Sequence, residues 1–382
     1  MKKFFTFGII TLLCIVLGGV VFSYTGISWL TPGPQVIAGD SVYGASYPRF
    51  VKDGSSLLVA YDIANPSGIT EVRYKKSTDN GTTWGGDSYL AANGEGTGAS
   101  TPQMLKLRNG DLLCAYLTGA HSGENHKIDI RKKNNNDDTW ISHSTVATYN
   151  GGPQEGIWEP FMIEHPAINN KVYCFYATEE HNTSNNGQRI AYKVSGDGGK
   201  NWGTEELMPS SNPSGPNCRD GMPGVVFLGD NNTMYIVFET SQLGAPHPMI
   251  IKARTLDSST GVWSGLKDVY IPSQAQRRAG APFVVKSANG DLICSFQTDN
   301  DLAFGTYPQD KCMQGAYCIS TDNGSTWGSK QNLFIVDKDD GVQFVKSNTL
   351  FMLNDTSIIA GSRSNKYTGT TPQILIKKGS LN

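Results

Sequence analysis

Two glutamates near the middle of the chain are of the residue type that acid–base and nucleophilic chemistry needs. Glu159 lies in "GIWEPFMI" and Glu239 lies in "YIVFET", and both stretches are apolar runs typical of buried strands. Two carboxylates on either side of a pocket can hydrolyse a glycosidic bond. One protonates the leaving oxygen, and the other attacks the anomeric carbon or activates water. The pair can act only if the fold brings the two strands together.

A repeat of about 60 residues determines where those strands lie. Short segments begin just before Pro48, Pro102, Pro160, Pro223 and Pro282, and a sixth segment, "GVQFVK" from Gly341, lacks the proline. Each of the six is followed by a polar turn and then by a second apolar run. Six units that each read as four short strands predict an all-β, six-bladed β-propeller.

A nine-residue phrase recurs within this repeat, as "STDNGTTWG", "SGDGGKNWG" and "STDNGSTWG". Its aspartates can accept hydrogen bonds from nearby backbone amides, and its tryptophans offer large apolar faces for packing. Catalysis rarely needs three copies of one site, so we interpret the phrase as a structural hairpin. The residues concerned are Asp79, Asp197, Asp322, Trp84, Trp202 and Trp327.

The phrase resembles the Asp-box, or bacterial neuraminidase repeat, of sialidases and related propellers. The resemblance covers residues 40–382 and implies a sialidase-like propeller with Asp-box hairpins. It implies a fold and not a substrate.

Strand direction predicts which end of the propeller holds a site. The loop that enters the first strand of a blade and the loop that leaves the second share one face, and the Asp-box turns lie on the other. Glu159 is the one charged residue among those that precede the five prolines, and Glu239 follows the aromatic residue of a second strand. Both are therefore expected at the same end, in adjacent blades. Substrate contacts are predicted at this end for Asp62, Trp158, Arg219, Asp220, Arg278 and Tyr43.

Three segments of the sequence resemble one particular family of propeller enzymes. "GIWEPFMIEHP", "DGMPGVVFL…YIVFET" and "RRAGAPFVV" resemble the strands of exo-α-1,5-L-arabinanases, glycoside hydrolase family 93. The resemblance implies that Glu159 is the nucleophile and Glu239 the general acid/base of a retaining hydrolase. The expected activity is release of arabinobiose from the non-reducing end of linear α-1,5-L-arabinan.

Two alternatives stay open. An exo-sialidase would hold its substrate carboxylate with arginines, one of them two places before the first-blade proline. In "ASYPRF" Arg49 instead follows the proline, which removes that part of the clamp. The second alternative is a carbohydrate-binding propeller without catalysis.

The remaining expectations come from composition and from the N-terminus. The formal net charge of −2 and a pI near 6.3 give no basic face for nucleic acid. Lys2 and Lys3 precede an apolar run at residues 4–22, typical of a secretory signal or an uncleaved anchor. We assign residues 1–30 to this segment and 31–382 to a secreted, monomeric propeller. Its partner would be a polysaccharide or oligosaccharide, with membrane contact only through the anchor. No cofactor or metal ion is expected.

Overall fold

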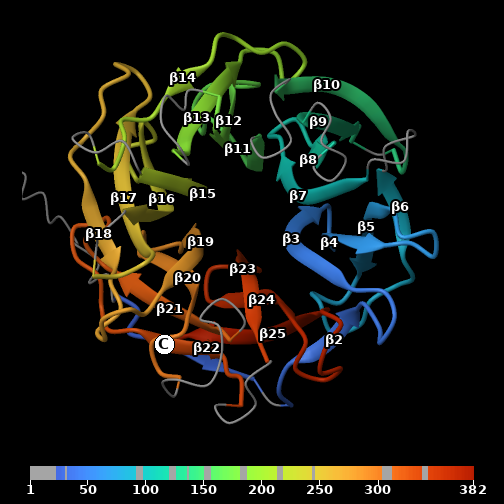
Figure 1. Ribbon diagram of the computed structural model, residues 1–382. Helices are drawn as coiled ribbons and strands as arrows, with labels where there is room; N and C mark the ends of the chain where they lie inside the picture. The colour runs from blue at the N-terminus through green and yellow to red at the C-terminus, as the bar shows by residue number, and fades with distance from the viewer. Residues whose placement is uncertain are drawn as a thin grey trace, which may run out of the picture.

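The computed structural model confirms the all-β prediction and shows six sheets around a central axis (Figure 1). The structure describes residues 23–30, 32–91, 98–119, 126–135, 137–149, 156–180, 187–212, 218–242, 246–302, 312–337 and 343–382. Of the predicted signal or anchor at residues 1–30, residues 1–22 lie outside these ranges. No helix in the described ranges is long and apolar enough to cross a membrane.

Each of the first five blades is an antiparallel sheet of four consecutive strands. Blade 1 contains β3 (Ala45–Asp53), β4 (Ser56–Ala64), β5 (Thr70–Ser77) and β6 (Ser88–Ala91). Blade 2 contains β7 (Ala99–Lys106), β8 (Leu112–Thr118), β9 (His126–Lys133) and β10 (Trp140–Tyr149). Blade 3 contains β11 (Ile157–Glu164), β12 (Val172–Thr178), β13 (Arg189–Ser195) and β14 (Glu206–Leu207).

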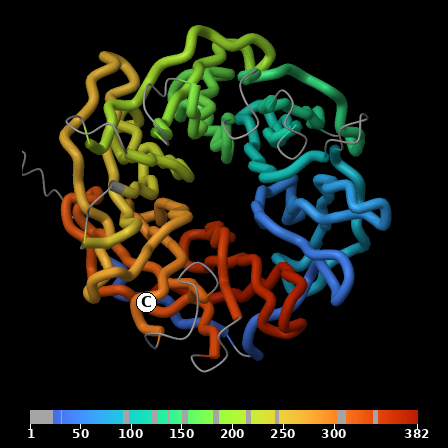
Figure 2. Tube along the Cα trace, in the orientation of Figure 1, coloured from blue at the N-terminus to red at the C-terminus, as the bar shows by residue number. Residues whose placement is uncertain are grey.

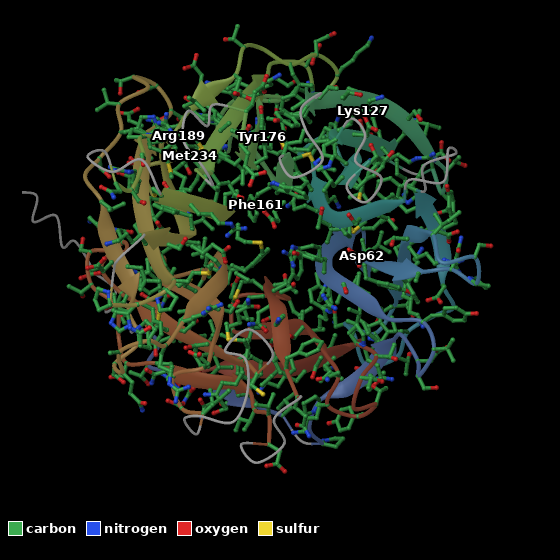
Figure 3. All side chains as sticks on the ribbon, in the orientation of Figure 1. Asp62, Lys127, Phe161, Tyr176, Arg189 and Met234 are labelled. Carbon is green, nitrogen blue, oxygen red and sulfur yellow. The ribbon has the colours of Figure 1, made fainter. Side chains whose placement is uncertain are left out.

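Blade 4 contains β15 (Cys218–Phe227), β16 (Thr233–Gln242), β17 (Ile250–Asp257) and β18 (Lys267–Tyr270). Blade 5 contains β19 (Ala279–Lys286), β20 (Leu292–Thr298), β21 (Gln314–Ser320) and β22 (Gln331–Phe334). The first strands of the six blades contact one another in a ring, so they are innermost and line the axis. Figure 3 labels Phe161 at the inner edge of blade 3, with Arg189 further out.

Blade 6 corrects the expectation that every unit supplies its own four strands. It contains β23 (Val345–Met352), β24 (Ser357–Ser364) and β25 (Gln373–Leu381), and its fourth strand is β1 (Ile27–Trp29) from the other end of the chain. A short strand β2 (Gln35–Ala38) also pairs with β25. Figure 2 shows the blue N-terminal segment beside the red C-terminal strands. The propeller therefore begins by Ile27, and a boundary at residue 30 is too late.

The anchor of blade 6 also lies further along the chain than "GVQFVK" suggested. The bulge that follows the proline anchor in other blades falls between Lys346 and Thr349, so Asn348 stands where they have proline. Because blade 6 lacks the proline, the sequence alone does not identify Asn348 as the equivalent position.

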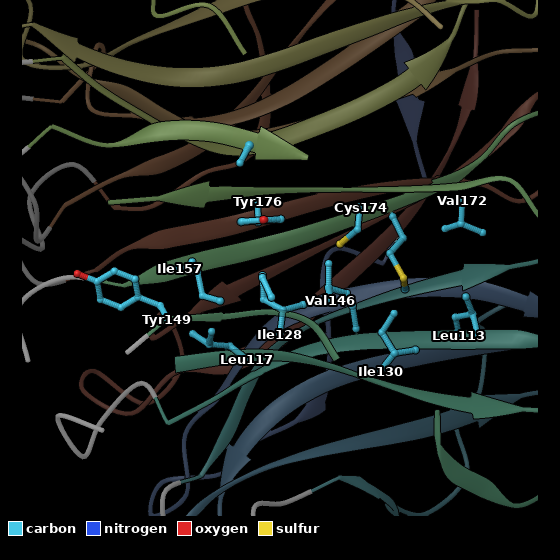
Figure 4. Close-up of a cluster of buried hydrophobic side chains, with 14 of the residues drawn as sticks. Leu113, Leu117, Ile128, Ile130, Val146, Tyr149, Ile157, Val172, Cys174 and Tyr176 are labelled. Carbon is cyan, nitrogen blue, oxygen red and sulfur yellow. The ribbon is translucent and has the colours of Figure 1, made fainter. Parts of the chain in front are cut away.

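Apolar side chains from adjacent blades form the core. The cluster in Figure 4 joins blade 2 residues such as Leu113 and Ile130 to blade 3 residues such as Val172 and Cys174, all of them buried. Second strands are buried on both faces because a blade is covered on either side by its neighbours. This explains their unbroken apolar runs.

The Asp-box residues close the turn between the third and fourth strands. Asp79 accepts hydrogen bonds from the backbone amides of Thr82 and Thr83 at 3.0 and 2.8 Å, and Gly81 has a φ of 80°. The turn also joins neighbouring blades. Tyr235 of blade 4 donates its hydroxyl to the carbonyl of Gly324 in the blade 5 box, at 2.9 Å.

Candidate active site

The six inner strands share one irregularity of the backbone, a bulge at the end where the two glutamates lie. Each has a bulge, and one residue inside each bulge has a positive φ of 45–53°. Such a conformation costs non-glycine residues about 1–3 kcal/mol, so its recurrence in every blade marks it as a requirement of the fold. The six residues are Tyr47, Thr101, Glu159, Met222, Ala281 and Ser347.

Glu239 of β16 is buried and ion-paired. Its side chain is 7% exposed, and Oε1 accepts a hydrogen bond from a guanidinium nitrogen of Arg219 at 2.8 Å. Oε2 accepts one from the backbone amide of Ala281 in blade 5, also at 2.8 Å. Both carboxylate oxygens therefore have donors, and one of these donors is charged.

The Glu239–Ala281 contact belongs to a recurring link between blades. Asp62 Oδ2 accepts from the amide of Thr101 at 2.9 Å, and Gln297 Oε1 accepts from the amide of Ser347 at 3.1 Å. Asp62, Glu239 and Gln297 hold the same register position in their sheets. Each accepts the amide of the positive-φ residue in the following blade, so the fold uses a polar acceptor here even without chemistry.

Glu159 of β11 differs from Glu239. Its Oε2 is buried and has no hydrogen-bond partner among the described residues. Burial raises the pKa of Glu159 to about 7, and the Glu239 carboxylate adds to the rise, whereas Arg219 and Arg49 oppose it. Arg49 belongs to blade 1, and Glu239 and Arg219 belong to blade 4, so charged groups of both blades influence Glu159. The structure thus brings the two predicted glutamates into one electrostatic group.

Two residues of blade 1 complete that group, and sequence reasoning did not include them in the site. Arg49 lies 5.0 Å from the ring centre of Phe283 and 5.8 Å from that of Tyr47. Burial lowers the pKa of Arg49 to about 10, although Tyr47, Asp62 and Glu159 oppose the shift. Burial also raises the pKa of Tyr47, and Glu159 adds to that rise. The sequence could have indicated Tyr47, because Tyr47 occupies in blade 1 the repeat position that Glu159 occupies in blade 3.

Trp158 is held by a third carboxylate. Glu179, which follows β12, accepts hydrogen bonds from the indole nitrogen of Trp158 at 3.0 Å and from the amide of Gly156 at 2.8 Å. The ring of His126 meets Trp158 edge to face at 4.8 Å. Glu179 therefore fixes the aromatic side chain beside Glu159.

Two of the other residues predicted to contact substrate are arginines, Arg219 and Arg278. Arg219 is in the group through Glu239. Arg278 occupies the position in blade 5 that Arg219 has in blade 4, since their parallel bridges to Met249 and Gln188 correspond. The Arg278 side chain is half-buried, and its Nε has no hydrogen-bond partner among the described residues.

Two predictions of substrate contact need correction, those for Asp220 and Tyr43. Asp220 is 1% exposed and accepts hydrogen bonds from the amide and hydroxyl of Ser211, so it fixes a loop. Asp62 is 7% exposed and links blades 1 and 2 as Glu239 links blades 4 and 5, so its contact with substrate stays a prediction. Tyr43 lines a separate cavity of about 450 Å³ with residues of β2, β4 and β5, away from the inner strands. The repeat predicts the end of the propeller at which these residues lie, but not the partners or the direction of their side chains.

A cavity of about 450 Å³ occupies the axis on the other side of Arg49. All six inner strands contribute to it, with aromatic residues such as Phe161, Phe283 and Phe351 and with Arg49 itself. Arg49 thus lies between an apolar channel and the charged group around Glu159 and Glu239.

Comparison with known proteins gives the fold. No protein-family model matches the chain, and no curated protein matches it. An α-L-arabinanase of Penicillium chrysogenum, solved with arabinobiose, superposes with a TM-score of 0.70 at 20% identity, covering 92% of this chain and 99% of that one. An α-L-arabinofuranosidase of family 93 from Fusarium graminearum, also solved with arabinobiose, gives 0.66 at 17% identity over 88% and 92%.

A sialidase is also similar, though less closely. The Hadza microbial sialidase gives a TM-score of 0.57 at 12% identity, covering 88% of this chain and 66% of that one. The resemblance found in the sequence is therefore confirmed at the level of structure. The chain has the sialidase-like six-bladed propeller fold that the family 93 arabinanases and arabinofuranosidases share.

Proposed function

We propose that this protein is a secreted, retaining glycoside hydrolase that acts on linear α-1,5-L-arabinan and releases arabinobiose from the non-reducing end. The observation that carries the proposal is the pair of carboxylates from adjacent blades, Glu159 on β11 and Glu239 on β16, within one electrostatic group. The two arabinobiose complexes with the same fold support the choice of substrate.

The pair has the chemical asymmetry that glycoside hydrolysis requires. One carboxyl must carry a proton for the leaving oxygen while the other stays charged to stabilise the oxocarbenium-like transition state. Burial and a neighbouring like charge raise the pKa of Glu159, whereas Glu239 is bonded to a guanidinium. Glu159 therefore favours its protonated form, whereas the Glu239 carboxylate has a charged hydrogen-bond donor.

We assign Glu159 as the nucleophile and Glu239 as the acid/base, as the resemblance implies. In the free protein Glu159 holds its proton up to about pH 7, because burial disfavours its charged form. Glu159 must lose that proton before it attacks. Arg219, which is hydrogen-bonded to Glu239, and Arg49 favour the charged form of Glu159. The contacts of the free protein taken alone would suit the opposite assignment, so the roles need a direct test.

Product analysis on linear α-1,5-L-arabinan tests the activity. The expected result is early release of arabinobiose alone. Glu159→Gln and Glu239→Gln should each lower turnover by at least about 100-fold while the protein stays folded. Gln297 performs the same inter-blade contact with an amide, so glutamine at position 239 can keep the link to Ala281. Wild-type rates in either variant would remove that residue from the mechanism.

Azide rescue tests the two roles. With an activated aryl α-arabinobioside, azide should attack the open face of the sugar in Glu159→Gly and give the β-azide. In Glu239→Gly it should react with the glycosyl-enzyme and give the α-azide. The opposite products would exchange the two assignments.

The two alternatives are outcomes of the same screen. Activity on sialyl conjugates, with none on arabinan, would indicate a sialidase. Against this, Arg219 is already bound to Glu239 and is not free to clamp a substrate carboxylate. Binding of arabinan without any product would indicate a non-catalytic propeller.

A further inference from the structure

The first described residues are attached to a buried carboxylate far along the chain. The backbone nitrogen of Tyr24 donates a hydrogen bond to Asp291 Oδ2 at 2.7 Å, across 267 positions. Asp291 lies in the turn before β20 and is 4% exposed. The Tyr24 hydroxyl also donates to the carbonyl of Asp355 in the corresponding turn of blade 6, at 3.2 Å.

An internal comparison shows what Asp291 lacks. Asp111 occupies the same place before β8 in blade 2, and there Lys132 forms an ion pair with its carboxylate at 2.8 Å. Lys132 is the strand partner of Leu113, and the equivalent pair in blade 5 is Ile293 with Ile319. Isoleucine therefore replaces the lysine, and no ion pair joins Asp291 to another described residue. The nitrogen of Tyr24 is the donor that the structure supplies instead.

Around Tyr24 the chain passes within a few residues from an apolar run to backbone that is hydrogen-bonded to the propeller. The apolar run at residues 4–22 is followed by Ser23, which is small and exposed. From Thr25 onward the backbone is part of the propeller, since the amides of Thr25 and Gly26 donate to the carbonyl of Asn382. Small residues precede the cleavage point of secretory signals. The Ser23–Tyr24 bond thus immediately precedes Tyr24, whose backbone nitrogen is already hydrogen-bonded to the propeller.

We propose that a signal-peptidase-type enzyme hydrolyses the Ser23–Tyr24 bond, and that the new α-ammonium group of Tyr24 forms an ion pair with Asp291. The peptide C–N bond breaks, and water supplies hydroxide to the carbonyl carbon of Ser23 and a proton to the nitrogen of Tyr24. A further proton from solvent makes that nitrogen cationic. The amide–carboxylate hydrogen bond then becomes a charge-assisted one, and Asp291 gains the cation that Lys132 provides for Asp111.

The cleavage point is tested by producing the full chain in a secreting bacterial host and determining the N-terminus of the exported protein by intact mass and terminal sequencing. The expected first residue is Tyr24. An uncut chain, or any other first residue, would overturn the proposal.

The ion pair is tested by a double-mutant cycle on two forms of the protein, one that begins at Tyr24 and one with Gly-Gly before Ser23. All strands lie within residues 27–381, so both forms keep the whole propeller. Asp291→Asn should lower Tm by about 2 °C more in the form that begins at Tyr24. The excess should be present at pH 6 and absent by pH 10, because an α-ammonium group with an ordinary pKa near 8 loses its charge as pH rises.

Asp111→Asn is the matched control, since Lys132 is its partner in both forms. It should lower Tm equally in the two. Equal effects of Asp291→Asn in the two forms would show that no ammonium group acts there and would contradict the proposed pair.

Discussion

At the scale of single residues, the sequence indicates a candidate site at the positions that depart from the repeat. Glu159 and Glu239 were found because most blades have uncharged residues at the same positions. Arg49 and Tyr47 were missed because nothing in the sequence shows the positive φ of Tyr47 or the packing of Arg49 on Phe283. The prediction for Asp220 is wrong because sequence places this residue near the end of the propeller but does not show that its carboxylate already accepts hydrogen bonds from Ser211.

The pKa of Glu159 predicts the shape of the pH profile. As the nucleophile, Glu159 must be ionised, so kcat/KM should rise about tenfold per pH unit below pH 7 and level off above it. As the acid, Glu159 must be protonated, and kcat/KM should instead fall above pH 7. Steady-state rates between pH 4.5 and 9, measured where the protein stays folded, distinguish the two assignments independently of azide.

The same group predicts a pH dependence of stability. Burial raises the pKa of Glu159 from about 4.5 to about 7, so between these values the folded state binds more protons than the unfolded state. The free energy of unfolding should therefore fall as pH rises from 4.5 to 7, by on the order of 1–3 kcal/mol from this residue. Urea unfolding of the wild type and of Glu159→Gln at pH 5 and pH 8 measures the difference. A variant that shows the same pH slope as the wild type would rule out this contribution.

At the scale of elements, the Asp-box turn is a place where sequence and structure agree in detail. Asp79 accepts from the Thr83 hydroxyl at 2.7 Å as well as from two backbone amides, and the Thr83 amide lowers the pKa of Asp79 well below its usual range. A short phrase predicts such a turn because all its contacts are local. The links from Asp62, Glu239 and Gln297 to the next blade could not be predicted in this way, because each depends on the bulge of another strand.

Asp79→Ala should destabilise the protein without affecting the chemistry. The turn loses its main acceptor, so we expect Tm to fall by about 2–4 °C while kcat at 25 °C stays within twofold of wild type. Asp138→Ala is the control, since Asp138 is exposed and lies in the weaker echo of the phrase in blade 2. Thermal melts and arabinan assays measure both effects. A stable but inactive Asp79→Ala protein would contradict the structural reading of the phrase.

At the scale of the whole molecule, the two ends of the chain close the ring. β1 runs antiparallel to β25, with Ile27 opposite Leu381, so the start of β1 and the end of β25 lie on the face of the Asp-box turns. That face is opposite the end that holds Glu159 and Glu239. The number of blades could be read from the repeat, but the closing strand could not, because Ile27–Trp29 carries no repeat signature and lies only a few residues after the apolar run at residues 4–22.

Ring closure predicts that a single apolar residue of the N-terminal strand affects the whole fold. Ile27 is 8% exposed and packs in the cluster that joins blades 5 and 6, and its amide donates to the hydroxyl of Tyr317 at 3.0 Å. Ile27→Ala keeps that hydrogen bond but leaves a cavity, so it should cost about 2–4 kcal/mol of unfolding free energy. Leu30→Ala, at a side chain that is 54% exposed, should cost less than about 0.5 kcal/mol.

Both changes are best made in a chain that begins at Tyr24, so that export does not affect the comparison, and urea unfolding measures them. Because β1 lies at the outer edge of blade 6 and on the other face from Glu239, Ile27→Ala should leave kcat unchanged at 25 °C while the protein is folded. If Ile27→Ala were no more destabilising than Leu30→Ala, the strand would not be closing the ring. Stability that drops while turnover persists would show that closure and chemistry use opposite faces of one propeller.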